Sequence, residues 1–214
     1  MRLLWIAPFC LTLAACGGSS SPVVEDPIVP DLPAAPTDPD PVDPPTGGAQ
    51  TGAEMRSSAT SLLLEFADPV VFTELSNVPS SMTATYDGYA YGTLAGNPST
   101  ITDTLTGSLS MSIGLASNTA NISGTISNFV DDADNAVTGD LTITDGAFNR
   151  AGDPSDDPTL SINFAGTLTD AGQDLVVGGQ LQGDFLDTNY NGVGGALLGQ
   201  VNGHPINGGF IAER

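Results

Sequence analysis

The feature that most constrains the fold is a run of apolar residues at every second position with a glycine among them, repeated along residues 86–212. Side chains that alternate in this way lie on opposite faces of a β-strand, so each run predicts a strand with one buried and one solvated face. We count eight such strands. The runs are Tyr86-x-Gly88-x-Ala90, Leu105-x-Gly107-x-Leu109, Ile122-x-Gly124-x-Ile126, Val137-x-Gly139-x-Leu141, Phe164-x-Gly166-x-Leu168, Leu181-x-Gly183-x-Phe185, Leu197-x-Gly199-x-Val201 and Gly208-x-Phe210-x-Ala212.

Glycine inside a strand costs stability, so a repeated inward glycine requires a geometric cause. A small barrel supplies one, because a narrow interior fills best when large and small side chains alternate and because glycine permits sharp coiling. Short connections with turn residues, such as Asp170-Ala171-Gly172 and Asn202-Gly203, imply antiparallel neighbours. The sequence therefore predicts an all-β fold: an eight-stranded antiparallel up-and-down β-barrel over residues 81–214, its lumen filled by side chains.

Two other β architectures fit the pattern less well. A membrane-spanning barrel turns its apolar face outward and carries aromatic girdles, whereas the aromatic residues here are few. A parallel solenoid shows one fixed repeat, whereas the glycines are unevenly spaced, with a long gap between Gly139 and Gly166.

The chain begins with Met1-Arg2 and an apolar run that ends at Leu13-Ala14-Ala15-Cys16, the order of a secretory signal. Leu-Ala-Ala-Cys resembles the lipobox of bacterial lipoproteins. That resemblance implies a signal peptide over residues 1–15 and a Cys16 that carries covalent lipid, including palmitate. Gly17 resembles the residue found at that position in lipoproteins sent to the outer membrane. The alternative is a plain secreted protein with one stray thiol.

Residues 16–54 contain closely spaced prolines with interleaved aspartates, which excludes both helix and paired strand. We expect a disordered tether; about 30 residues of polyproline-like chain reach on the order of 90 Å. The tether either lifts the domain clear of a membrane or is a passive leader.

Residues 55–80 contain the candidate helix, which we expect to be a short cover packed on the barrel. Ser57 or Ser58 are the candidate caps, and Pro69 is the expected stop. The predicted apolar face consists of Leu62, Leu63, Leu64 and Phe66. A helix that docks on a partner is the alternative.

The charge balance excludes several functions, because 25 Asp and Glu residues oppose 4 Lys and Arg residues and give a net charge of −21. Nucleic acid is not an expected partner, since the chain has no cationic patch to neutralise phosphates. Enzymatic activity is not expected either. The one histidine, His204, lies in a predicted turn, the chain has no lysine, and no nucleophile-elbow motif is present.

Asp187-Thr188-Asn189-Tyr190-Asn191-Gly192 matches the first half of a calcium-binding loop, in which Asp187, Asn189 and Asn191 supply the oxygens. The twelfth position, where a bidentate glutamate closes the shell, is Leu198. Weak calcium binding and a hairpin turn rich in Asx residues therefore both stay open. The acidic stretches 131–135 and 153–157 carry the same ambiguity, and we expect no other cofactor.

Tyrosines are the candidate ligand-binding residues. Tyr89 and Tyr91 are out of phase with Tyr86, which places them on the outer face of the first strand. Together with Tyr190 they form a candidate contact surface for recognition. Packing of the preceding helical segment over Tyr89 and Tyr91 explains these residues equally well.

The closing strands, with Gly183-Asp184-Phe185, the glycine-rich stretch 193–199 and Gly208-Gly209-Phe210-Ile211-Ala212, resemble those of transferrin-binding protein B-like β-barrel lipoproteins. The stretch 78–88 is similar to the start of those barrels. The resemblance implies a monomeric surface lipoprotein of the outer membrane whose barrel binds a protein or small ligand. This chain has room for one barrel only. A structural envelope lipoprotein without a specific ligand is the alternative.

Overall fold

The glycine-centred runs form strands in the computed structural model, which describes residues 50–67, 71–94, 104–116, 119–154 and 158–214. The predicted signal peptide, Cys16 and the linker up to residue 49 lie outside the described residues. The elements are α1 (Gly52–Ala67), β1 (Ser81–Leu94), β2 (Thr104–Ala116), β3 (Thr119–Asp131), β4 (Ala136–Val137), β5 (Leu141–Phe148), β6 (Leu160–Asp170), β7 (Gln173–Leu186), β8 (Gly192–Val201) and β9 (His204–Glu213).

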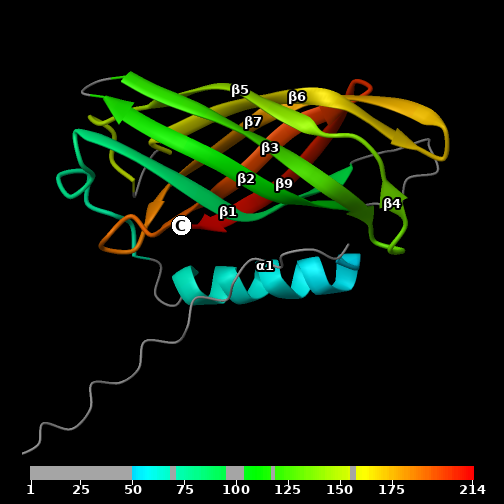
Figure 1. The fold of residues 1–214 in the computed structure, drawn as a ribbon, viewed down its shortest axis with the longest axis horizontal. Coiled ribbons are helices and arrows are strands. Elements are labelled where there is room, and N and C mark those ends of the chain that lie inside the picture. The colour runs from blue at the N-terminus through cyan, green and yellow to red at the C-terminus, as the bar shows by residue number, and fades with distance from the viewer. Residues whose placement is uncertain (1–49, 68–70, 95–103, 117–118, 155–157) are drawn as a thin grey trace, which may run out of the picture. The chain divides into compact units, whose positions relative to one another are not determined.

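Eight of the strands close into an antiparallel barrel (Figure 1). Their order is β2-β1-β9-β8-β7-β6-β5-β3, and pairing of β2 with β3 completes the circle. Among these eight strands, those that follow one another along the chain are neighbours, and β9 pairs with β1. The predicted eight-stranded up-and-down barrel is therefore confirmed.

The fourth predicted strand differs from the expectation at its centre. Val137 and Leu141 are both buried, as the alternation predicts. Gly139 between them has a φ of 109°, which is incompatible with an extended strand. The chain breaks there into the short β4, paired with β3, and the longer β5, while Thr138 pairs with Thr169 of β6. The strand centred on Gly139 was therefore a wrong prediction, because the backbone changes partners at that point.

Two predicted hairpin turns have the backbone that their sequences favour. Ala171 and Gly172 have φ of 47° and 81°, and Asn202 and Gly203 have φ of 49° and 83°. Positive φ at both central residues is characteristic of the type I′ turn, whose twist matches that of the flanking strands. These turns fix the register of β6 with β7 and of β8 with β9.

Helix α1 starts earlier than the sequence analysis predicted. Thr51 caps it: the Thr51 hydroxyl accepts a hydrogen bond from the Glu54 main-chain N–H at 3.2 Å, and the Thr51 N–H donates to the Glu54 carboxylate at 2.9 Å. This reciprocal pair is a capping box. The same bond holds the pKa of Glu54 below its ordinary value. Ser57 and Ser58 lie inside the helix, so neither is the cap.

One face of α1 packs on the outer wall of the barrel. Met55, Ala59 and Phe66 are buried in a cluster that includes Tyr89 and Ile211 of the wall. Leu62 and Leu63 are half-buried there, but Leu64 is 67% exposed and was wrongly assigned to the apolar face. Its position, about 200° around the helix from Phe66, turns it to solvent. Among the described residues, no helix has both the length and the apolar character required to cross a membrane.

Candidate binding surfaces

One end of the barrel, called here the capped end, is closed by the segment 71–80 and by the connections that follow β5 and β7. Phe72 forms a bridge with Leu186, and the Thr73 N–H donates to the Phe185 carbonyl at 2.9 Å. These residues extend the sheet at the end of β7. Val78 is 2% exposed and belongs to the lumen core.

Arg150 holds this cap in place. Its guanidinium donates to the main-chain carbonyls of Val78 and Pro79, each at 2.7 Å, and of Leu75 at 3.4 Å. It also lies 5.0 Å from the centre of the Phe148 ring. A cation that satisfies three carbonyls of one segment fixes that segment against the barrel.

The predicted calcium loop is the β7–β8 connection at the capped end. The Asp187 carboxylate accepts hydrogen bonds from the Asn189 main-chain N–H and from the Asn191 side-chain amide, the latter at 2.8 Å. The Asn191 side-chain oxygen accepts from Arg214 Nε at 3.3 Å. The oxygens of Asp187 and Asn191 that a cation would require are thus used by the turn and by Arg214 in this structure.

Metal ligation by Asp187, Asn189 and Asn191 stays a prediction. The part of the chain that the structure describes contains no group of three or more His, Cys, Asp or Glu side chains arranged to hold a metal ion. The hydrogen bonds of Asp187 are those of an Asx turn, the alternative that the sequence left open.

Tyr190 lies in the same connection and is half-buried. Its main-chain carbonyl accepts a hydrogen bond of 2.8 Å from the hydroxyl of Tyr86, and the guanidinium of Arg214 lies 4.5 Å from the centre of its ring. Burial raises the pKa of the Tyr86 phenol well above its ordinary value. Tyr86 therefore remains a donor and ties the turn to the lumen core.

The acidic stretch 131–135 anchors α1. The Asp131 carboxylate accepts hydrogen bonds from the main-chain N–H groups of Ala133 and Asn135 at 2.9 and 2.7 Å, which shapes the turn. Asp134 Oδ1 accepts from the Ala53 N–H at 3.1 Å and lies 3.4 Å from the Arg56 guanidinium. A carboxylate at a helix N-terminus is favoured by the helix dipole. Residues 155–157 of the other acidic stretch lie outside the described residues.

The two outer tyrosines differ in their surroundings. Tyr89 is 7% exposed beneath α1, and its hydroxyl donates to the Gln50 side chain at 3.2 Å. Tyr91 is half-buried, and its hydroxyl lies 2.8 Å from the point that a Cβ on Gly209 would occupy, so its ring lies across Gly209. Packing of the helix over Tyr89 is the alternative that the sequence left open, and a partner cannot reach this ring while α1 is docked.

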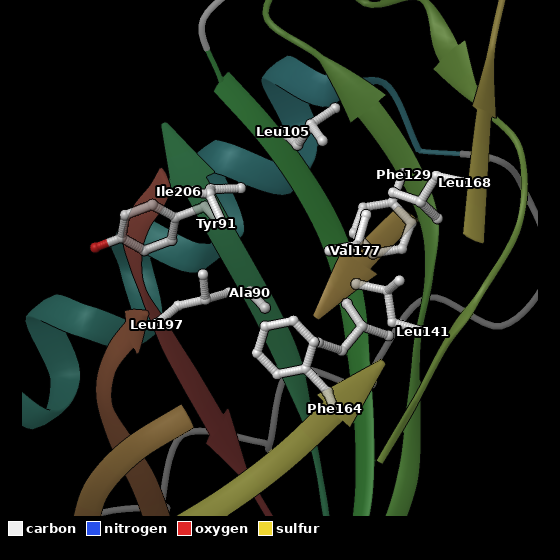
Figure 2. A pocket seen from close by; sticks show the side chains of 12 residues that line it. Ala90, Tyr91, Leu105, Phe129, Leu141, Phe164, Leu168, Val177, Leu197 and Ile206 are labelled. Carbon is white, nitrogen blue, oxygen red and sulfur yellow. The ribbon is translucent and has the colours of Figure 1, made fainter. Parts of the chain in front are cut away.

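The lumen contains a cavity at the end opposite the cap (Figure 2). Its volume is about 20 Å³, close to the space that one water molecule requires. In Figure 2 the hydroxyl of Tyr91 points away from this space. Its walls are apolar, and they are formed by Ala90, Tyr91, Gly92, Leu105, Ile126, Phe129, Leu141, Phe164, Leu168, Val177, Leu197 and Ile206. The filled lumen that the strand number predicted is confirmed.

The outer wall of β7 and β8 carries features that the sequence analysis missed. Val176 is 63% exposed and Leu198 is 42% exposed, although both are large apolar side chains. The signal was present in the sequence, because both residues fall on the outward phase of their runs, next to the inward Val177 and Leu197. Single exposed apolar residues are common on protein surfaces, so these two alone do not define a contact surface.

Comparisons with known proteins identify no relative of this chain. No family model matches it, no curated protein matches it, and no solved structure matches it. The resemblance to transferrin-binding protein B-like lipoproteins therefore stays a prediction.

Proposed function

We propose that the chain is a lipoprotein anchored in the outer membrane, which presents the barrel at the cell surface as a binding module for a protein or small ligand. The observation that supports this proposal is the filled lumen, which decides where a ligand can bind. A cavity of about 20 Å³ admits no ligand of ordinary size. Contact must then be made by the outer wall and the end connections.

The anchor rests on Leu13-Ala14-Ala15-Cys16 and on the proline-rich stretch that follows it. Lipid on Cys16 would fix the chain to a membrane, and the linker would separate the barrel from it. We expect cells supplied with labelled palmitate to incorporate label into the full chain. We expect a Cys16→Ser variant to incorporate none and to leave the membrane fraction.

Surface display is tested on intact cells. We expect added protease to cut the 16–54 linker and to release a fragment that contains the barrel, while a periplasmic marker protein stays intact. A barrel that is cut only after the outer membrane is broken would show that it faces the periplasm. That result would favour a structural envelope lipoprotein without a ligand outside the cell.

A further inference from the structure

The middle of the wall built from β6, β7, β8 and β9 is uncharged. Residues 160–169, 175–183 and 192–212 contain no Asp, Glu, Lys or Arg, in a chain whose net charge is −21. Most acidic side chains lie instead at the strand ends and in the connections, as at Asp170, Asp174 and Asp187. Asp184, two residues after Gln182 in β7, is 7% exposed, and its carboxylate accepts hydrogen bonds from Thr159. A ligand on the middle of this wall meets one ionic group, the Asp145 carboxylate at the edge beside Asn163, so we expect charge to contribute little to its selection.

Carboxamides form a ladder across the wall. Gln180 Nε2 donates to Asn163 Oδ1 at 2.9 Å, and Gln182 Nε2 donates to Gln180 Oε1 at 3.1 Å. Asn163 in turn donates to the Asp145 carboxylate, where the uncharged region ends. Each carboxamide has two donor hydrogens and two acceptor sites, and the ladder uses only some of them. The wall therefore offers oriented donors and acceptors to a ligand.

Apolar groups lie beside the ladder. Leu198 is paired directly with Gln180, and Ala196 is paired with Gln182. Ala196 of β8 is paired on its other side with Gly209 of β9, and the Tyr91 ring lies across that glycine. Ala196 and Gly209 therefore separate the ladder from the Tyr91 ring, and the exposed Leu198 lies beside them on β8.

We infer that this surface, the amide wall (Asn163, Gln180, Gln182, Ala196 and Leu198), binds an uncharged polysaccharide. Sugar hydroxyls both donate and accept hydrogen bonds, as carboxamides do, and the C–H faces of sugar rings pack on flat apolar surface. The inference rests on the proposed function, since a polysaccharide would be the ligand of the displayed barrel.

The shape of the wall favours a polysaccharide over a second copy of the chain as its occupant. The outside of a closed barrel is convex, so two copies would touch along a narrow strip, whereas a stable protein interface buries about 1,200 Å² or more. A linear polymer can follow a convex wall, and its many repeats add avidity.

The test uses the full chain in a mild detergent, with affinity electrophoresis through gels that contain one polysaccharide each. The neutral set is dextran, galactomannan and a β-glucan, and the charged set is alginate and chondroitin sulfate. We expect at least one neutral polysaccharide to retard the protein and added salt to leave the retardation unchanged. We expect Leu198→Asp to weaken binding about tenfold or more, because it places a charge at the contact. Leu64→Asp is the matched control, an exposed leucine on α1 that should bind as the parent does.

Three results overturn the inference: no retardation by any neutral polysaccharide, retardation by the charged set alone, or equal binding by the Leu198→Asp and Leu64→Asp variants. Sedimentation tests whether a second copy of the chain occupies the wall instead. If the parent chain forms a dimer that Leu198→Asp abolishes, and no polysaccharide binds, the occupant is a second copy. Protease release from intact cells tests display separately. A displayed barrel without polysaccharide binding removes this inference and leaves the proposed function standing.

Discussion

Replacing Phe66 with alanine tests whether α1 is held on the barrel by its apolar face. Phe66 is 9% exposed, and its ring approaches to 2.8 Å the point where a Cβ on Gly192 would lie. Truncating a buried phenylalanine costs about 3–4 kcal/mol through lost burial and the cavity left behind. Alanine favours a helix more than phenylalanine does by about 0.5 kcal/mol, and this difference offsets a small part of the loss in stability. We expect a net loss of about 3 kcal/mol.

The loss should appear in the docking of α1 rather than in the barrel. Phe66 belongs to the outer cluster with Met55, Tyr89 and Ile211, which is separate from the core that fills the lumen. Hydrogen exchange measured by mass spectrometry is the assay, because it reports each segment separately. We expect exchange in α1 to rise by about two orders of magnitude, with the β6 and β7 amides unchanged.

Leu64→Ala is the control on the same helix, since its side chain is 67% exposed and should cost less than about 0.5 kcal/mol. Equal effects of the two substitutions would refute the assignment of the buried face. Faster exchange in all strands with Phe66→Ala would show instead that helix and barrel unfold as one unit.

Three further predictions concern the barrel itself. Burial and the nearby Glu65 carboxylate raise the pKa of Glu213, so its contribution to stability is present below its unfolded pKa and is lost as the pH rises through the folded pKa. Glu213→Gln should therefore make stability fall less as the pH rises above the ordinary glutamate pKa of about 4.3, as thermal unfolding would show. Gly183→Ala places a Cβ 2.1 Å from a main-chain oxygen of β8 and should lower the unfolding free energy by about 1–3 kcal/mol, whereas Gly178→Ala, whose Cβ meets nothing closer than 3.9 Å, should not lower it; equal denaturant midpoints would contradict this. Tyr86→Phe removes the hydrogen bond to the β7–β8 connection and should cost about 0.5–1.5 kcal/mol in the same assay, with hydrogen exchange increased in that connection.

The sequence also contained signals that its interpretation missed. Thr51-x-x-Glu54 is a local capping pattern that places the start of α1 before Met55. Leu198 is an apolar residue on the polar phase of its strand, and such a residue is visible without coordinates. Both are local features, so they were predictable in principle.

The sequence by itself determined the eight-stranded barrel, all but one of its strands and the turns Ala171-Gly172 and Asn202-Gly203, because alternation and positive φ depend on neighbours along the chain. Only the tertiary structure decided that the strand breaks at Gly139, where Thr138 pairs with Thr169 on β6, a residue 31 positions away in the sequence. It also decided that α1 covers Tyr89 and that Arg214 lies over the ring of Tyr190. Burial and side-chain partners are set by residues far apart in the chain, which the closing of the barrel brings together.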